Sequence, residues 1–397
     1  MNHSKTNFSC FLLIIFFMVS CGGSKDQQKA KGPNAELELE VVDSLVVDEL
    51  EPLLMDDHMA DLGYYMLRNY KSRQPLLVDE NGTVIQEYDI LNDGPNGIGS
   101  YGAGYRLLND TAWLAQNLMT GYYVFDYQGN RIKELPAVTE GIFSITINAT
   151  RTTFHPYSKN GELYVLGEER NAYNHKEINA EKLGADFYSQ AKTIFNYNIE
   201  DVESELITTY PEEWEPRKSG RYVGEASPLV TINRKNKEMA LLPSAGSQLF
   251  IYDYSGEEPI LKDSVKLSHR FRPDLAPDID LDAERWLDDY PFFMDLRVLG
   301  DGYLLGFYTR IPKEILKELR AKSEQYYQLP EFQEASKQYA KPYYIVVKDG
   351  KQVGVINELP VHGGINFSDE EGFIYVNDNL DPEVERDYNV FYRLKVK

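Results

Sequence analysis

The sequence predicts an all-β body built from repeated four-stranded units. Three segments share one pattern, in which an Asp closes an apolar strand, a Gly follows shortly after, and a second strand comes next; their acidic residues are Asp79, Asp126 and Asp253. The separation of Asp79 from Asp126 falls within the roughly 40–50 residues of a propeller blade. Aromatic residues make up 13% of the chain, which suits strands and disfavours disorder. Together these observations predict a six-bladed β-propeller.

The glycines of the repeat predict tight hairpin turns. Gly82, Gly129 and Gly256 supply the positive φ that such turns need, so each is expected between adjacent antiparallel strands of a separate sheet. The aspartates recur together with the turns. We therefore interpret them as turn caps and not as calcium ligands or catalytic groups.

Counting the repeats gives six blades, at residues 52–95, 97–140, 143–212, 220–270, 285–358 and 361–397. Apolar runs at 111–115, 162–166, 239–242 and 303–307 are expected to be inner strands. The alternating segment 36–47 can complete the last blade, which would close the ring and hide a sheet edge. Short helical insertions are predicted at 175–191 and 312–340. A seven-bladed ring or two packed β-domains would account for the same strands.

The N-terminus has the features of an export signal. Polar residues that include Lys5 precede the uncharged apolar run 10–19, which as a helix would span about 15 Å, half of a bilayer core. This length and order are typical of a signal peptide. The run ends at Ser20 and Cys21, a junction that resembles the bacterial lipobox, in which the cysteine is lipidated. The sequence therefore predicts a signal peptide at 1–20, a lipidated Cys21 with a flexible tether at 21–38, and a propeller at 39–397.

Cysteine usage and charge narrow the function classes. The chain has 2 cysteines, Cys10 in the apolar run and Cys21 at the junction, so the mature body cannot form an internal disulfide. An exported protein with its last cysteine at this position is expected to use it as a membrane anchor. The net charge of −22, from 41 basic and 63 acidic residues, would repel phosphate backbones and excludes nucleic acid as a partner.

A known family shares these features. The lipoprotein start, the glycine-containing turn at 94–97 and the closing strand at 391–395 resemble the domain-of-unknown-function 4221 family. They are also similar to the six-bladed propeller lipoproteins of Bacteroidetes. The resemblance implies a propeller fold and a location in the cell envelope, on the outer membrane and facing either the periplasm or the cell surface.

One candidate ligand site stands out in an acidic chain. The segment 268–274 is its densest basic spot, and an earlier stretch between blades adds two arginines and a tryptophan. Arginine forks suit carboxylates, and tryptophan suits sugar rings. Salt bridges to the abundant acidic residues are the alternative role of the same arginines. The candidate ligand-binding residues are Trp214, Arg217, Arg221, His269, Arg270 and Arg272.

Other motifs do not indicate a cofactor or a metal. Residues 97–102 match a dinucleotide-binding glycine pattern, but strands on both sides make an inter-blade linker the better interpretation. Asp278, Asp280 and Asp282 imitate a calcium loop without its glycine and its final glutamate. The histidines are isolated from one another in sequence, which disfavours zinc. No catalytic residues, cofactor or metal ligands are predicted.

The function predicted from the sequence is that of a membrane-anchored envelope lipoprotein whose propeller binds a protein or a glycan. The alternative is a propeller enzyme, a glycosidase or a lyase, that acts on polysaccharide. A deep funnel with converging carboxylates would favour the enzyme, whereas a plugged channel would favour the binding protein. Fold alone does not decide between them.

Overall fold

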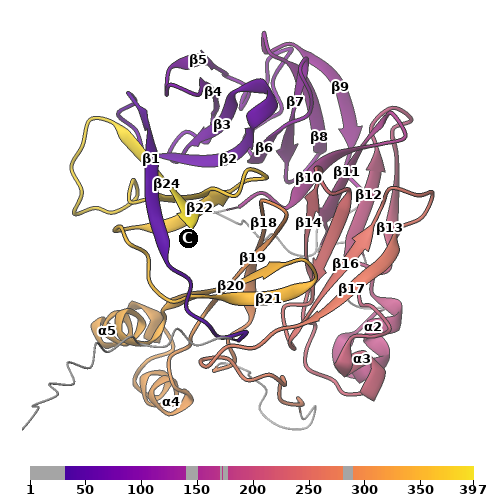
Figure 1. Cartoon of the computed structure of the whole chain (residues 1–397), viewed down its shortest axis with the longest axis vertical. Helices are drawn as coiled ribbons and strands as arrows, with labels where there is room; N and C mark the ends of the chain where they lie inside the picture. Colours follow the sequence, from indigo (N-terminus) through magenta and orange to yellow (C-terminus); the bar gives the residue numbers. More distant parts are fainter. Residues whose placement is uncertain (1–31, 140–150, 170–171, 173–177, 280–288) are drawn as a thin grey trace, which may run out of the picture.

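The structure is a computed structural model that describes residues 32–139, 151–169, 172, 178–279 and 289–397. Its strands form six four-stranded antiparallel sheets that surround a central axis as the blades of a propeller (Figure 1). The predicted fold class and the predicted count of six blades are confirmed.

The first three blades follow the chain order. Blade 1 contains β2 (Leu53–Met59), β3 (Tyr64–Asn69), β4 (Pro75–Asp79) and β5 (Val84–Glu87). Blade 2 contains β6 (Gly102–Leu107), β7 (Ala112–Asn117), β8 (Gly121–Asp126) and β9 (Arg131–Pro136). Blade 3 contains β10 (Phe154–Lys159), β11 (Glu162–Glu168), β12 (Ile194–Asn198) and β13 (Glu203–Ile207).

The last three blades differ only in how the sixth is completed. Blade 4 contains β14 (Leu229–Asn233), β15 (Glu238–Leu242), β16 (Gln248–Asp253) and β17 (Ile260–Lys266). Blade 5 contains β18 (Phe293–Leu299), β19 (Gly302–Tyr308), β20 (Pro342–Lys348) and β21 (Lys351–Ile356). Blade 6 contains β22 (Gly364–Ser368), β23 (Ile374–Asn377), β24 (Asn389–Val396) and β1 (Leu39–Val47).

The first strand of each blade lies at the axis. Strands β2, β6, β10, β14, β18 and β22 contact one another in a closed ring. The runs expected to be inner strands, at 111–115, 162–166, 239–242 and 303–307, belong instead to β7, β11, β15 and β19, second from the axis. These second strands are strongly apolar, whereas four of the axial strands, β2, β6, β10 and β18, carry charged residues and look less like a core in the sequence.

The N-terminal strand closes the ring, as predicted. β1 pairs with β24 in antiparallel register from Leu39↔Val396 to Val47↔Asn389, so the chain's two ends share one sheet (Figure 1). Leu45 and Val47 are buried there in a cluster shared with blade 1. This pairing covers the edge that β24 would otherwise expose.

The end of the predicted tether is attached to the body. The backbone N–H of Leu37 donates to the carbonyl of Val355 at 2.8 Å, and Val355 N–H donates to Ala35 at 2.8 Å. These bonds place residues 35–37 along β21 of blade 5, so the part of the tether that begins at Gly32 is ordered by the propeller. The sequence predicts flexibility up to residue 38 because this stretch has few apolar residues. In the structure, the backbone of residues 35–37 forms hydrogen bonds with the edge of β21.

The recurring aspartates cap turns, as predicted. Asp79 Oδ1 accepts hydrogen bonds from the backbone N–H of Asn81 at 2.9 Å and of Thr83 at 2.8 Å. Gly82 between them has a φ of 85°, a conformation that glycine adopts without strain. Gly129 has a φ of 86° and lies between β8 and β9, and Gly256 lies between β16 and β17, each in a separate sheet. Gly256 does not have the positive φ predicted for it, so that part of the prediction is wrong.

The insertions are helical where they were predicted. Between β11 and β12 lie α1 (Ala180–Leu183), η2 (Gly184–Asp186) and α2 (Phe187–Gln190). Between β19 and β20 lie α4 (Lys313–Lys322), η3 (Tyr326–Gln328) and α5 (Pro330–Tyr339), outside blade 5 in Figure 1. Two further short helices of the described residues are η1 (Ala60–Leu62) and α3 (Glu215–Ser219). The glycine-rich residues 97–102 connect β5 to β6, as expected of an inter-blade linker.

Candidate functional site

A small pocket lies on the axis, lined from all six blades. It offers about 50 Å³ to the centres of water-sized molecules, enough for a few waters. Its charged and imidazole groups come from blade 1 (Asp56, Asp57, His58), blade 2 (Arg106), blade 3 (Arg151, His155), blade 4 (Arg234), blade 5 (Arg297) and blade 6 (Asp369, Glu370). Four successive blades thus contribute one arginine each, and the acidic groups come from the two blades that complete the ring.

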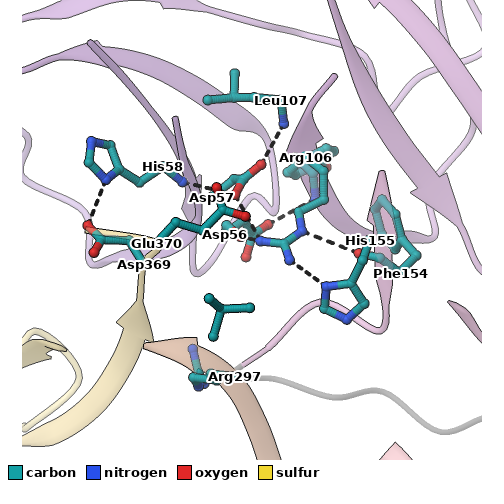
Figure 2. Close-up of polar contacts among 12 residues, drawn as sticks. Asp56, Asp57, His58, Arg106, Leu107, Phe154, His155, Arg297, Asp369 and Glu370 are labelled. Carbon is teal, nitrogen blue, oxygen red and sulfur yellow. Dashed lines mark hydrogen bonds and ion pairs between the residues drawn. The ribbon is translucent and has the colours of Figure 1, made fainter. Parts of the chain in front are cut away.

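Arg106 joins three blades across this pocket (Figure 2). Its Nη1 donates to Asp57 Oδ1 and to the carbonyl of Asp56, both at 2.9 Å, and its Nε donates to the carbonyl of Phe154 at 3.3 Å. Its Nη2 donates to Nδ1 of His155 at 2.7 Å. Burial lowers the pKa of Arg106, and the nearby Asp57 carboxylate opposes that effect. Arg106 therefore acts as a charged crosslink between β2, β6 and β10.

His155 is held neutral by its surroundings. Burial is the largest cause that lowers its pKa well below the ordinary value, and the charges of Arg106, Arg151 and Arg234 lower it further. Because arginine can only donate, the bond from Arg106 also requires an unprotonated Nδ1. A protonated His155 would lose this bond and face three cations.

The other arginines of the pocket are each paired with one carboxylate. Arg151 contacts Glu168 at 2.8 Å, Arg297 contacts Asp295 at 2.6 Å, and the Nε of Arg234 contacts Glu370 at 3.2 Å. Although burial opposes the charge of Arg234, Asp57 and Glu370 hold its pKa above the ordinary value. The pocket is therefore rich in charge and close to balanced.

A tyrosine–aspartate–histidine group stands beside the arginines. His58 Nδ1 lies 2.9 Å from Asp369 Oδ2, and the Tyr375 hydroxyl donates to the same oxygen at 2.8 Å. The other oxygen, Oδ1, accepts the backbone N–H groups of Glu371 and Phe373. His58 also stacks on Tyr65, with ring centroids 4.2 Å apart. Asp369 is thus the turn cap of blade 6, and it orients the imidazole of His58.

The axial pocket opens through a wider mouth. A cavity of about 380 Å³ shares His58, Arg234, Asp369 and Glu370 with it and adds the turn residues Met59, Ala60, Asp61, Lys235 and Glu371. The mouth lies where β2, β14 and β22 end. Among the described residues no hydrogen bond engages Nη1 or Nη2 of Arg234, and its side chain is 27% exposed. The Arg234 side chain therefore lines both the axial pocket and the mouth, beside Glu370.

The candidate residues predicted from the sequence lie elsewhere, near the connections that precede β14 and β18. Trp214 is fully buried in the core of blades 3 and 4. Arg217 donates to the Tyr210 carbonyl, and Arg221 forms ion pairs with Glu215 and Asp278. The ion pairs of Arg221 are the salt bridges that the sequence offered as the alternative role, whereas the bond of Arg217 is to the backbone.

The second half of the predicted set is divided between interior and surface. His269 is buried, donates from Nε2 to Asn357 Oδ1 at 3.2 Å, and has a pKa that burial lowers to about 4. Arg272 is buried with its guanidinium 3.8 Å from the Phe293 ring centroid. Arg270 alone is exposed, and its guanidinium lies 4.6 Å from the Phe271 ring centroid. A ligand site that uses the whole set stays a prediction.

The described residues contain neither a cluster of metal-ligating side chains nor a membrane-spanning helix. Asp278 pairs with Arg221, whereas Asp280 and Asp282 of the calcium-like segment lie outside the described residues. Within the described ranges no three His, Cys, Asp or Glu side chains gather as metal ligands would. No helix in those ranges is long and apolar enough to cross a membrane.

Sequence reasoning missed the axial group. Its members are scattered from Asp56 to Glu370, and no two blades carry the same motif. The available signal was positional: each charged residue lies in or next to the first strand of its blade. Because the sequence predicts the second strands of the blades at the axis, it does not point to these charged residues.

Together, the ring of blades and the charged axial pocket define a six-bladed β-propeller with a polar channel closed to a narrow chamber. Its fold is that of a solved DUF4221-family structure from Bacteroides vulgatus, with a TM-score of 0.60 at 15% identity over 91% of this chain and 99% of that chain. The resemblance predicted from the sequence is confirmed at the level of the fold.

Weaker likenesses cover most of the chain as well. A protein of Bacteroides fragilis described as exported has a TM-score of 0.47 and 9% identity over 91% of this chain and 95% of that chain. Hydrazine synthase of Kuenenia stuttgartiensis has a TM-score of 0.37 and 11% identity over 81% and 78%. No family model and no curated protein matches the sequence.

Proposed function

We propose that this chain is an envelope lipoprotein, anchored in the outer membrane through Cys21, whose propeller binds an anionic group of a glycan or protein. The address is supported by the uncharged run 10–19 and by the junction at Cys21, after which the sequence has no cysteine. The described body begins at Gly32, close behind that junction.

The observation that carries the binding function is the position of Arg234. Its side chain lines both the axial pocket and a mouth of about 380 Å³, and Lys235 and His58 line the same mouth. An arginine fork pairs with a carboxylate through two parallel bonds. Asp61 and Glu371 also line the mouth, and their charge would repel a polyanion. The site therefore suits a single carboxylate on an otherwise neutral ligand, such as one uronic acid in a glycan or a chain end of a protein.

The size of the axial pocket favours binding over catalysis deep in the channel. Its roughly 50 Å³ compares with the roughly 300–1,000 Å³ of pockets that enclose small ligands. Its arginines each hold a carboxylate, so no free acid–base pair of carboxyl groups converges there. A ligand would insert one functional group and leave the remainder on the face of the propeller.

The binding site is tested with the mature lipoprotein in detergent on an array of uronate-containing and neutral glycans, together with capture of partners from envelope extracts. We expect uronate-dependent binding that weakens by about 10- to 100-fold in Arg234→Gln, the loss of one charge-assisted pair. Arg221→Gln removes an arginine that pairs with Glu215 and Asp278 and does not line the mouth, so this variant is the matched control and should bind normally. Equal binding by both variants would reject the proposed site.

The anchor is tested separately. The Cys21→Ala variant should leave the membrane fraction after a carbonate wash or remain unprocessed, because acyl chains supply the attachment. Retention of this variant with membranes would contradict the lipoprotein assignment.

One observation favours the enzyme alternative, namely the orientation of His58 by Asp369 at 2.9 Å. An imidazole held by a carboxylate can abstract a proton, and Arg234 beside it can neutralise a uronate carboxylate, as a lyase requires. We expect no unsaturated product when uronate-containing polysaccharides are incubated with the protein. Ultraviolet-absorbing product that disappears in His58→Gln would establish the lyase instead.

A further inference from the structure

The segment 268–275, which leads from β17 toward β18, holds the start of the described chain. Asn34 Nδ2 donates to Ser268 Oγ at 3.2 Å. The side-chain amide of Gln352 on blade 5 accepts the Ser268 N–H and donates to the Ser268 carbonyl, both at 2.8 Å, and also donates to the carbonyl of Pro33. The root of the tether is therefore fixed to the side of the propeller where blades 4 and 5 meet.

This attachment limits how far the segment can stand from the anchor. Even fully extended, the residues between Cys21 and Gly32 span at most about 40 Å. If Cys21 is acylated, as in the proposed function on which this inference rests, segment 268–275 stays close to the bilayer. The opposite side of the ring has no such constraint.

The exposed side chains of the segment have the chemistry of a membrane interface. Phe271 is 41% exposed and Leu275 is 61% exposed. Arg270 is exposed too, with its guanidinium above the Phe271 ring at 4.6 Å. Aromatic and aliphatic side chains enter the headgroup region, and a guanidinium pairs with lipid phosphates. Asp274 is exposed in the same segment, so the surface is apolar with one charge of each sign, in a chain of net charge −22.

We propose that Arg270, Phe271 and Leu275 form a membrane-facing patch that rests on the phospholipid headgroups around the anchor. The side of the ring formed by blades 4 and 5 then faces the bilayer, and the side formed by blades 1 and 2 faces away from it. The mouth near Arg234 opens at an end of the propeller axis and stays accessible to a ligand in this orientation.

The sequence supplies a clean labelling experiment, because the only cysteine of the mature chain is Cys21. Leu275→Cys adds one free thiol for an environment-sensitive NBD dye. The acylated protein is reconstituted into vesicles of phosphatidylethanolamine and phosphatidylglycerol that contain nitroxide-labelled lipid. Tyr101→Cys is the matched control: it is 57% exposed and lies in the connection between blades 1 and 2, half a turn around the ring.

We expect the nitroxide lipid to quench the dye at position 275 and not at position 101, and we expect Arg270→Glu to reduce the quenching at 275. Equal quenching at the two positions on acylated protein would overturn the patch. Intact mass is measured on the same samples. A mass without acyl chains would overturn the lipoprotein assignment itself, and the two failures are thereby distinguished.

Discussion

Arg106 donates to His155 of the neighbouring blade at the centre of the propeller, from Nη2 to Nδ1 at 2.7 Å. The bond connects blade 2 to blade 3 and sets the protonation state of the imidazole, because a protonated His155 could not accept it. The same arginine holds Asp57 of blade 1. The axial pocket is thus a set of interblade contacts as well as a chamber.

The first prediction concerns acid stability. The pKa of His155 is depressed in the folded protein by burial and by three arginines, so its contribution to stability is present above the unfolded value of about 6.5 and is lost as pH falls below it. His155→Gln should remove that loss, up to about 1.4 kcal/mol for each pH unit. Urea unfolding at pH 7.5 and pH 5 measures it.

His362 provides the control for this experiment. Asp381 raises its pKa, and its side chain is 71% exposed, so the charged form is favoured when folded. His362→Gln should therefore leave the destabilisation at pH 5 in place. If His155→Gln loses as much stability between the two pH values as the unmodified chain, the imidazole is not the cause.

The second prediction concerns ring closure. Leu45 of β1 is 4% exposed and packs in the cluster between blades 6 and 1, whereas the adjacent Val46 is 45% exposed. Leu45→Ala should lower the free energy of unfolding by about 2–4 kcal/mol. Val46→Ala should change it by less than about 1 kcal/mol. Denaturant titration of both variants measures the two changes in the free energy of unfolding. Equal changes would mean that the packing of β1 does not stabilise the ring.

The third prediction compares two turn glycines. Gly82 and Gly161 have φ values of 85° and 87°, so alanine is strained at both. At Gly82 a Cβ would lie 1.8 Å from the Val46 carbonyl oxygen, whereas at Gly161 it would meet nothing within 4 Å. We expect Gly161→Ala to cost about 1–2 kcal/mol and Gly82→Ala about 1–3 kcal/mol more.

Thermal or urea unfolding of the two variants separates the cost of the strained φ from the cost of the close contact with Val46. The excess cost at Gly82 measures how closely the blade 1 turn approaches the closing strand. Two variants of the same stability would show that the turn and β1 are not in contact in solution.

The fourth prediction concerns the buried ion pair between Arg68 and Asp56. Nη2 and Oδ1 are 3.0 Å apart, and each side chain is 1% exposed. Burial raises the pKa of Asp56, and the charges of Arg68 and Arg106 oppose it. Arg68→Met should cost about 3–5 kcal/mol, because it leaves a buried carboxyl without its partner.

A double-mutant cycle tests that explanation. Arg68→Met combined with Asp56→Asn should cost clearly less than the sum of the two single substitutions, since neither charge is then left alone. Additive costs, measured by urea unfolding, would indicate that the two side chains do not interact.

Much of the architecture could be predicted from local patterns. The Asp–Gly turns at Asp79 and Asp126 follow from short-range hydrogen bonding, and their spacing predicts the blade count. The alternation in 36–47 indicated the closing strand. The axial residues could not be found this way. Arg106 and His155, or His58 and Asp369, are far apart in sequence and meet only because separate blades converge.

The candidate ligand residues illustrate the same limit. Trp214 and Arg272 were selected as residue types that bind sugars and anions, but the fold buries both. The sequence does not distinguish Arg234 from the many other charged residues in turns. Arg234 becomes a candidate because the fold brings it close to Glu370 and Asp57. Both residues are far from it in the sequence.

The sequence by itself determined the repeated hairpins and the expectation of an anchored, acidic β-protein with about six blades, because turn chemistry, hydrophobic alternation and charge are local properties. Only the tertiary structure decided which strands line the axis and which charges share a pocket. It also decided that the tether root lies against Ser268. Those relationships arise when six sheets close into one ring, so that residues separated by several blades are brought within hydrogen-bonding distance.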